Sequence, residues 1–151
     1  MARTDAASRL IKALAETIYA AHLDPKAVAT WRPPHGMRAE VYTFDVREGG
    51  GYRMAFVHED ASVRGKTADN ADVFEGAFVK LVPNERIVER VVFQSDDPAF
   101  AGAMTITTTL TPVTGGTDVA IVCENVPEGI SAQDHQVGMT STLANLAAFV
   151  E

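Results

Sequence analysis

The sequence predicts a single α+β domain in which a curved antiparallel sheet of about seven strands wraps around one long C-terminal helix. Residues from about 37 to 126 form a succession of short alternating runs separated by turns, and residues 130–151 carry apolar side chains at helical spacing. A lone amphipathic helix beside such a sheet buries its apolar stripe best across the concave face. A chain of 151 residues fits one domain, residues 1–151.

The segment before the sheet predicts one strand and two short helices. Residues 8–15 alternate weakly and are interpreted as the first strand, and the following residues as the first helix. Asp24 then reads as the N-cap of the second helix, with Pro25 at the first helical position, where its missing N–H costs nothing. This helix should end near Trp31, because the prolines at 33 and 34 cannot continue it.

Six further strands are separated by turn sequences rich in Gly, Pro and Asn. The tight turns are expected at residues 48–50, 83–86 and 114–116, with looser excursions at 60–71, which is polar and without periodicity, and at 95–101. The predicted strands are residues 37–47, 51–59, 73–82, 87–94, 103–112 and 117–126.

The closing segment, residues 130–151, predicts an amphipathic helix with Ser131 as its N-cap and Asp134 in the position of a capping-box acid. Its apolar stripe mixes Leu with a Met, a His and a neighbouring Thr, whereas a sealed core would more often use aliphatic side chains throughout. We therefore expect a ligand-sized cavity beneath the helix, under Met139 and Leu143. The stripe consists of His135, Met139, Leu143, Leu146 and Val150, with Thr142 and Phe149 beside it.

Two strands carry information about the faces of the sheet. In residues 103–112, Met104, Ile106, Thr108 and Leu110 alternate with Ala and Thr, so the Met/Ile side is expected to face inward. In residues 87–94, apolar side chains occur on both parities. That strand is either covered on both sides or lines a homodimer contact, and the sequence leaves both alternatives open.

Composition excludes several classes of partner. The net charge is −7 and the pI is near 5.0, which argues against nucleic acid and anionic membrane surfaces, because both favour basic patches. The single Cys123 has no disulfide partner, the N-terminus lacks a signal-peptide core, and no apolar run is long enough to span a bilayer. We expect a cytoplasmic location.

No catalytic or metal-binding motif stands out. None of the four histidines has metal-ligand spacing, so neither a metal nor a cofactor is predicted. Arg64 to Thr67 ends like a phosphate-binding loop, but Asp60 replaces the required Gly and no helix follows. Neither Ser8 nor Ser141 lies in the Gly-x-Ser-x-Gly setting of a serine hydrolase.

Three titratable residues are candidates for a pocket. His135 lies on the inward stripe of the last helix, although position alone favours a partly exposed residue near the helix start. His58 shares a strand parity with Met54 and Phe56, or else belongs to a solvated strand end. Glu75 is either a buried acid or, more commonly for such a position, a solvent-facing one.

The residues expected to bind a ligand combine these candidates with large apolar side chains of the inner faces. Plain core packing is the safer interpretation for each one alone, and only the assembly predicts a cavity. The predicted ligand-binding residues are Trp31, Met54, Phe56, His58, Phe78, Met104, Ile106, His135, Met139 and Leu143.

Several motifs together resemble the helix-grip superfamily of plant pollen allergens, lipid-transfer START domains and polyketide cyclases, often called SRPBCC. The nearest resemblance is to the branch related to the C-terminal domain of the activator of Hsp90 ATPase. The motifs are IYAAHLDPKAVATW at 18–31, Asp-x-Arg-x-Gly-Gly at 45–50, Phe-Glu-Gly at 74–76, PNERIV at 83–88, the Met-Thr strand from residue 104 with its Gly-Gly-Thr return, and the closing helix. The family usually carries a Trp near residue 138, where this chain has Met139.

The resemblance implies non-catalytic binding of a small apolar or amphipathic molecule between the sheet and the last helix. A polyketide cyclase or dehydratase is the alternative, and it would require His58, His135 or Glu75 to converge on a ligand. A protein-interaction module like the Hsp90 activator ranks lowest, because the chain ends where the helix-grip domain ends and no separate N-terminal domain is expected.

Overall fold

The computed structural model describes residues 3–60 and 71–151 and has the predicted α+β architecture. A seven-stranded, entirely antiparallel sheet has the order β1-β7-β6-β5-β4-β3-β2. The elements are β1 (Arg3–Ile11), α1 (Ala15–Leu23), α2 (Pro25–Trp31), β2 (Met37–Phe44), β3 (Gly51–His58), β4 (Ala71–Val82), β5 (Arg86–Phe93), the short 3-10 helix η1 (Pro98–Phe100), β6 (Ala103–Val113), β7 (Gly116–Val126) and α3 (Ala132–Val150).

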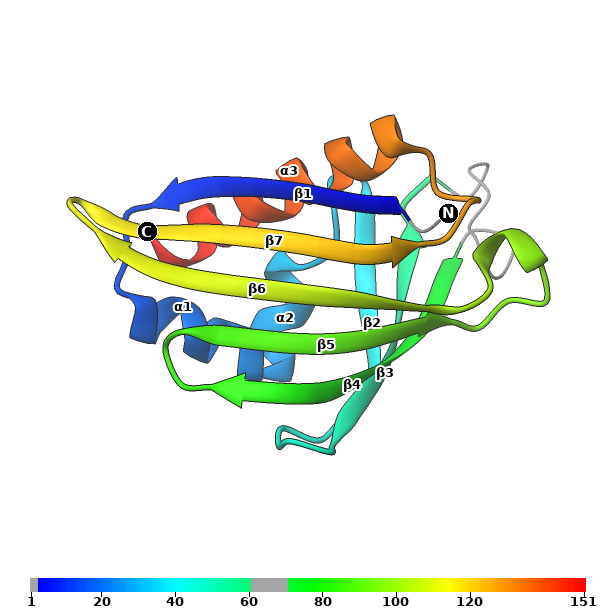
Figure 1. The fold of residues 1–151 in the computed structure, drawn as a ribbon, viewed down its shortest axis with the longest axis horizontal. Coiled ribbons are helices and arrows are strands. Elements are labelled where there is room, and N and C mark those ends of the chain that lie inside the picture. The colour runs from blue at the N-terminus through cyan, green and yellow to red at the C-terminus, as the bar shows by residue number, and fades with distance from the viewer. Residues whose placement is uncertain (1–2, 61–70) are drawn as a thin grey trace.

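The sheet is strongly curved, and α1, α2 and α3 all lie on its concave side (Figure 1). In this view β2 and β3 run at a steep angle to β6 and β7, so the sheet bends around the helices. Helix α3 packs along β1 and against α1 and α2. The arrangement leaves one face of the sheet open and encloses the other, as predicted for a single amphipathic helix.

The predicted first strand is wrong in position. Residues 8–15 were expected to form it, whereas β1 begins at Arg3 and ends at Ile11, and Leu14 is the N-cap of α1. Pairing with β7 extends the strand from Arg3, opposite Val126, to Ile11, opposite Thr117. The first residues of β1 are mostly small or polar, so tertiary pairing determines their conformation. The other six strands lie within three residues of their predicted bounds.

Both helix starts that the sequence marks are confirmed. The Asp24 carboxylate accepts a hydrogen bond from the Lys26 backbone N–H at 3.0 Å, and Pro25 occupies the first position of α2. The Ser131 hydroxyl accepts a hydrogen bond from the Asp134 N–H at 3.0 Å. Such caps satisfy backbone donors that the first turn of a helix leaves without partners.

The faces of the central strands follow the predicted alternation. In β6, Met104, Thr108 and Leu110 are buried. In β5, Ile87 and Val91 are buried while Val92 is exposed, so the described part of the chain covers this strand on one side only. The homodimer contact stays a prediction. The predicted excursion at 60–71 falls almost entirely on residues 61–70, which lie outside the described residues.

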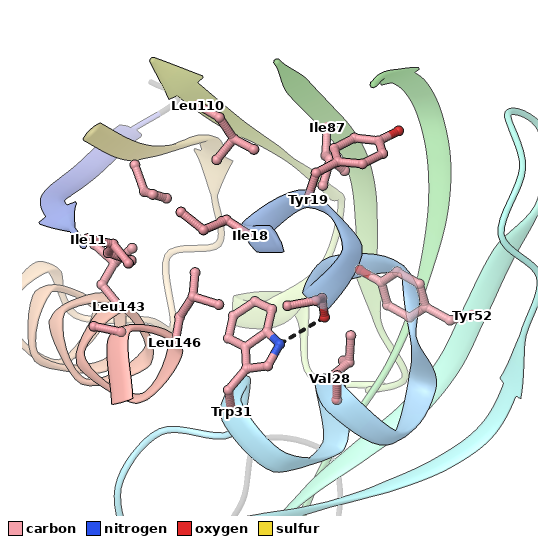
Figure 2. Close-up of a cluster of buried hydrophobic side chains, with 14 of the residues drawn as sticks. Ile11, Ile18, Tyr19, Val28, Trp31, Tyr52, Ile87, Leu110, Leu143 and Leu146 are labelled. Atoms are coloured by element: carbon pink, nitrogen blue, oxygen red, sulfur yellow. Dashed lines mark hydrogen bonds between the residues drawn. The ribbon is translucent and has the colours of Figure 1, made fainter. Parts of the chain in front are cut away.

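The largest apolar cluster fills the end of the sheet that α1 and α2 close (Figure 2). Trp31 lies in this cluster with 3% of its surface exposed, and its indole N–H donates to the Ala21 carbonyl at 2.9 Å, the dashed line in Figure 2. A smaller cluster joins β6, β7 and α3. Among the described residues, no helix is long and apolar enough to cross a membrane.

Candidate ligand site

A cavity of about 400 Å³ lies between the concave face of the sheet and α3. This volume is within the range of small-molecule sites, and mostly apolar lining is typical of them. Aromatic side chains from three strands face α3 across the cavity, and β6, β7 and the start of α3 complete its wall. The apolar part of the wall includes Trp31, Phe56, Phe74, Phe93, Met104 and Met139.

Six of the ten residues predicted to bind a ligand line this cavity. They are Trp31, Phe56, Met104, Ile106, His135 and Met139. Three others, Met54, Phe78 and Leu143, are packed into the apolar cluster that α1 and α2 cover, and they do not line the cavity. Their side chains do point inward, but they lie at the end of the sheet that the apolar cluster fills.

Two of the predicted titratable candidates lie away from the cavity wall. His58 is the last residue of β3, opposite Met37. Glu75 projects from the outer face of β4 with 54% of its side chain exposed, and its carboxylate is 3.8 Å from the Arg53 guanidinium. The hypothesis that Glu75 is a buried acid is therefore wrong, because its parity on β4 directs it to solvent.

The sequence patterns did not predict a buried polar cluster of Arg32, Tyr52 and Glu89. Glu89 Oε1 accepts one hydrogen bond from the Arg32 guanidinium at 2.9 Å and another from the Tyr52 hydroxyl at 2.7 Å. The Arg32 guanidinium also donates to the Tyr52 hydroxyl at 3.0 Å. The Glu89 side chain is only 4% exposed, and both Arg32 and Glu89 line the cavity. One end of the cavity therefore has an ionic wall.

Glu89 remains ionised in this setting. Burial alone would raise its pKa, but the Arg32 charge and the hydrogen bonds from Tyr52 and Arg32 outweigh burial and lower it. The pKa of Arg32 is raised, because attraction to Glu89 outweighs its own burial. Burial and the Glu89 charge raise the pKa of Tyr52, so its hydroxyl stays protonated and donates.

His22 of α1 adds a neutral imidazole to the same end of the cavity. Its Nδ1 is 2.8 Å from the Ile18 carbonyl, and since a carbonyl only accepts, Nδ1 carries the proton. Burial lowers the pKa of His22, which keeps the ring uncharged. The ring packs edge-on against Trp31 with a centroid separation of 4.7 Å. Nε2 is then a hydrogen-bond acceptor.

His135 lies at the other end, where it joins α3 to β1. Its Nδ1 is 2.7 Å from Asp5 Oδ2, and Asp5 also pairs with the Arg3 guanidinium at 2.9 Å. Arg3 in turn donates to the Ile130 carbonyl at 2.6 Å. Although burial opposes it, these hydrogen bonds and charges lower the pKa of Asp5. His135 thus lines the cavity but is already engaged by a carboxylate.

Cys123 is the only thiol, and it lies in the wall beside Met139, with 3.9 Å between the two sulfur atoms. Burial raises the pKa of Cys123 to about 12, so the thiol is protonated at neutral pH and is a poor nucleophile. Within residues 3–60 and 71–151, no group of three His, Cys, Asp or Glu side chains could hold a metal ion.

Comparison with known proteins identifies the family. Residues 12–151 match the family described as Activator of Hsp90 ATPase homolog 1-like protein. The chain belongs to this family. Among solved structures it is similar to protein CV1439 from Chromobacterium violaceum, with 36% identity, a TM-score of 0.87, and coverage of 98% of this chain and 96% of that one. A protein from Rhizobium loti is 26% identical, with a TM-score of 0.74 over 99% of this chain and 97% of that one. No curated protein matches the sequence significantly.

The predicted helix-grip fold of the Hsp90-activator-like family is therefore confirmed, and this fold commonly holds hydrophobic ligands. One of the motifs behind the resemblance has a structural reason at the site. Gly76 of the Phe-Glu-Gly motif lies opposite Tyr52, and a Cβ at this position would overlap the Tyr52 phenol ring. The missing side chain at Gly76 lets the ring lie flat on β4, with its hydroxyl against Glu89.

Proposed function

We propose that this protein binds a small apolar or amphipathic molecule, without catalysis, in the cavity between the sheet and α3. The observation that supports the proposal is the cavity of about 400 Å³ with its largely apolar, aromatic-rich wall. A hydrocarbon body in this cavity would make packing contacts with the apolar side chains of the wall. The wall also has polar groups at both ends, as expected for a ligand that is held in one orientation.

A thermal-shift screen of lipids, aromatics and polyketide-like molecules tests the proposal, because a ligand that binds only the folded state raises Tm. A cavity-filling variant, Met139→Trp, should remain folded and lose the Tm increase, since residue 139 is in the cavity wall. The matched control is Val92→Trp, which places the same side chain on the exposed outer face of β5. A ligand that stabilises Met139→Trp as much as the unaltered protein would contradict binding in this cavity.

General acid–base catalysis on a bound substrate is the second candidate, in the manner of a polyketide cyclase or dehydratase. One observation favours it: the cavity wall contains an ionised Glu89 and a neutral His22, either of which could accept a proton. Turnover assays on the ligands found in the screen separate the two functions. Saturable turnover that His22→Gln or Glu89→Gln abolishes, without loss of ligand affinity, would replace binding by catalysis.

We also retain the prediction of a cytoplasmic location, where the unpaired Cys123 would stay reduced.

A further inference from the structure

We infer that the ligand carries a neutral hydrogen-bond donor, such as a hydroxyl group, on its apolar body and gives it to the acceptors at the ionic end of the cavity. The inference rests on the proposed binding function and specifies the chemistry of its ligand. It comes from side-chain atoms that accept no hydrogen bond from the described part of the chain.

Glu89 supplies the strongest acceptor. Both of its hydrogen bonds from the described residues end on Oε1, and Oε2 accepts none. Every fully buried side-chain nitrogen or oxygen in the described chain has a partner, so Oε2 must be accessible, and Glu89 lines the cavity. A carboxylate oxygen in a largely buried site is costly to leave unpaired, and a ligand O–H can complete it.

Two neighbours offer further polar atoms to the same ligand. His22 Nε2 makes no hydrogen bond with a described residue, and the neutral ring leaves it an acceptor. Thr108, on the inner face of β6 next to the Ile106 that pairs with Glu89, is 3% exposed and also makes no side-chain hydrogen bond in the described chain. Glu89 Oε2 and His22 Nε2 are acceptors, and the Thr108 hydroxyl can either donate or accept. This set suits a ligand hydroxyl, which can donate, better than a ligand group that only accepts.

The charges of the wall determine the ionisation state of the donor. Among the described residues of the wall, the Glu89 carboxylate is paired with the Arg32 guanidinium. A ligand carboxylate at Oε2 would be repelled by the Glu89 carboxylate and would find Arg32 already paired. A ligand ammonium at Oε2 would lie close to the positive charge of Arg32, whose guanidinium is 2.9 Å from Oε1 of the same carboxylate. The ammonium would also lose its hydration. A neutral hydroxyl avoids both costs.

Four probes that share one compact hydrocarbon body test the inference: 1-adamantanol, its methyl ether 1-methoxyadamantane, adamantane-1-carboxylate and protonated 1-aminoadamantane. Dissociation constants come from titration calorimetry at pH 7. None of the probes absorbs where tryptophan emits, and Trp31 is the only Trp, so a change in its fluorescence places the binding at the cavity wall. The ether keeps the oxygen but removes the donor.

We expect 1-adamantanol to bind about 10- to 150-fold more tightly than the ether, because a hydrogen bond to a charged acceptor contributes about 1.5–3 kcal/mol. The carboxylate and the ammonium should bind more weakly than the alcohol. Equal binding of alcohol and ether, or tighter binding of either ion, overturns the inference and leaves cavity binding intact. If none of the four probes binds, the proposed function itself is contradicted, because the cavity has room for the hydrocarbon body that they share.

The variant Glu89→Gln tests whether the preference for the alcohol over the ether depends on Oε2 of Glu89. The amide oxygen can still accept from Arg32 and Tyr52, while the amide nitrogen turns the free acceptor into a donor, so the preference for alcohol over ether should fall below about threefold. The matched control is Glu75→Gln, the same change on the outer face of β4, which should keep the full preference. An unchanged preference in Glu89→Gln refutes the assignment. If Glu89→Gln does not fold, the ratio of the dissociation constants of ether and alcohol in the unaltered protein still tests the inference.

Discussion

Removing Arg32 should destabilise this protein far more than removing the whole ionic cluster. In Arg32→Met, Glu89 stays buried with only the Tyr52 hydroxyl as a partner, and breaking a buried pair in this way costs about 3–5 kcal/mol. Replacing all three members by apolar groups of similar shape, in Arg32→Met/Tyr52→Phe/Glu89→Leu, leaves no orphaned charge or hydroxyl. We expect this triple variant to lie within about 2 kcal/mol of the unaltered protein.

Urea denaturation at pH 7 measures both variants, and a cost of 3–5 kcal/mol is a large share of the roughly 5–15 kcal/mol that stabilises a typical domain. A loss below about 1 kcal/mol in Arg32→Met would mean that the pair contributes little to the native state. A triple variant that loses as much as Arg32→Met would mean that the cluster is strongly stabilising, in which case burying these charges is favourable rather than merely tolerated.

The Arg32–Glu89 pair also predicts that the free energy of unfolding falls at acid pH. The folded pKa of Glu89 lies below its ordinary value of 4.5, so the folded state binds fewer protons than the unfolded state in this range. The contribution of the ionised group is present above pH 4.5 and is lost as the pH falls through the lower folded pKa. Without the Arg32 charge, that pKa rises, and Arg32→Met should lose less stability than the unaltered protein between neutral and acid pH. Urea midpoints across this range test the sign.

Three further predictions concern single residues near the cavity. Trp31→Ala should cost about 3–5 kcal/mol in urea denaturation, because the indole is buried and its N–H is paired; a loss under about 1 kcal/mol would contradict its role in the core. Gly76→Ala should cost about 1–3 kcal/mol by the same assay, since the added methyl group displaces the Tyr52 ring; no loss would mean that the ring moves freely. Cys123 should react with iodoacetamide only after unfolding, and rapid labelling of the folded protein at pH 7 would show that the thiol is accessible and ionised.

Much of the fold could be predicted because its signals are local. Asp24-Pro25 starts α2 and Ser131 starts α3 through contacts within three residues, and Met104 to Leu110 reveal the inner face of β6 by their spacing. The first strand was misplaced because its residues before Ser8 have no apolar alternation, and only pairing with β7 defines them. The mixed stripe predicted a cavity beneath Met139 and Leu143; one lies against Met139, whereas Leu143 is packed into the apolar cluster.

The ionic end of the cavity depends on contacts that local patterns do not report. Arg32, Tyr52 and Glu89 are separated by 20 to 57 positions along the chain. One signal was present, however. Glu89 has the same parity on β5 as Ile87 and Val91, both buried, so the alternation itself directs a carboxylate inward. An acid between two core positions of a strand predicts a buried partner, and Arg32, just after the last turn of α2, supplies it.

Stability alone gives no reason for an ion pair at this place, because an apolar replacement of the same volume would serve the core as well or better. What the pair does provide is orientation. Arg32 and Tyr52 both donate to Oε1 of Glu89, which fixes the carboxylate in the cavity wall, while Oε2 accepts no hydrogen bond from the described residues. If the cluster serves ligand recognition, Arg32→Met/Tyr52→Phe/Glu89→Leu should fold nearly as stably as the unaltered protein and yet bind 1-adamantanol no better than its methyl ether. A triple variant that keeps the preference for the alcohol would show that recognition lies elsewhere in the wall.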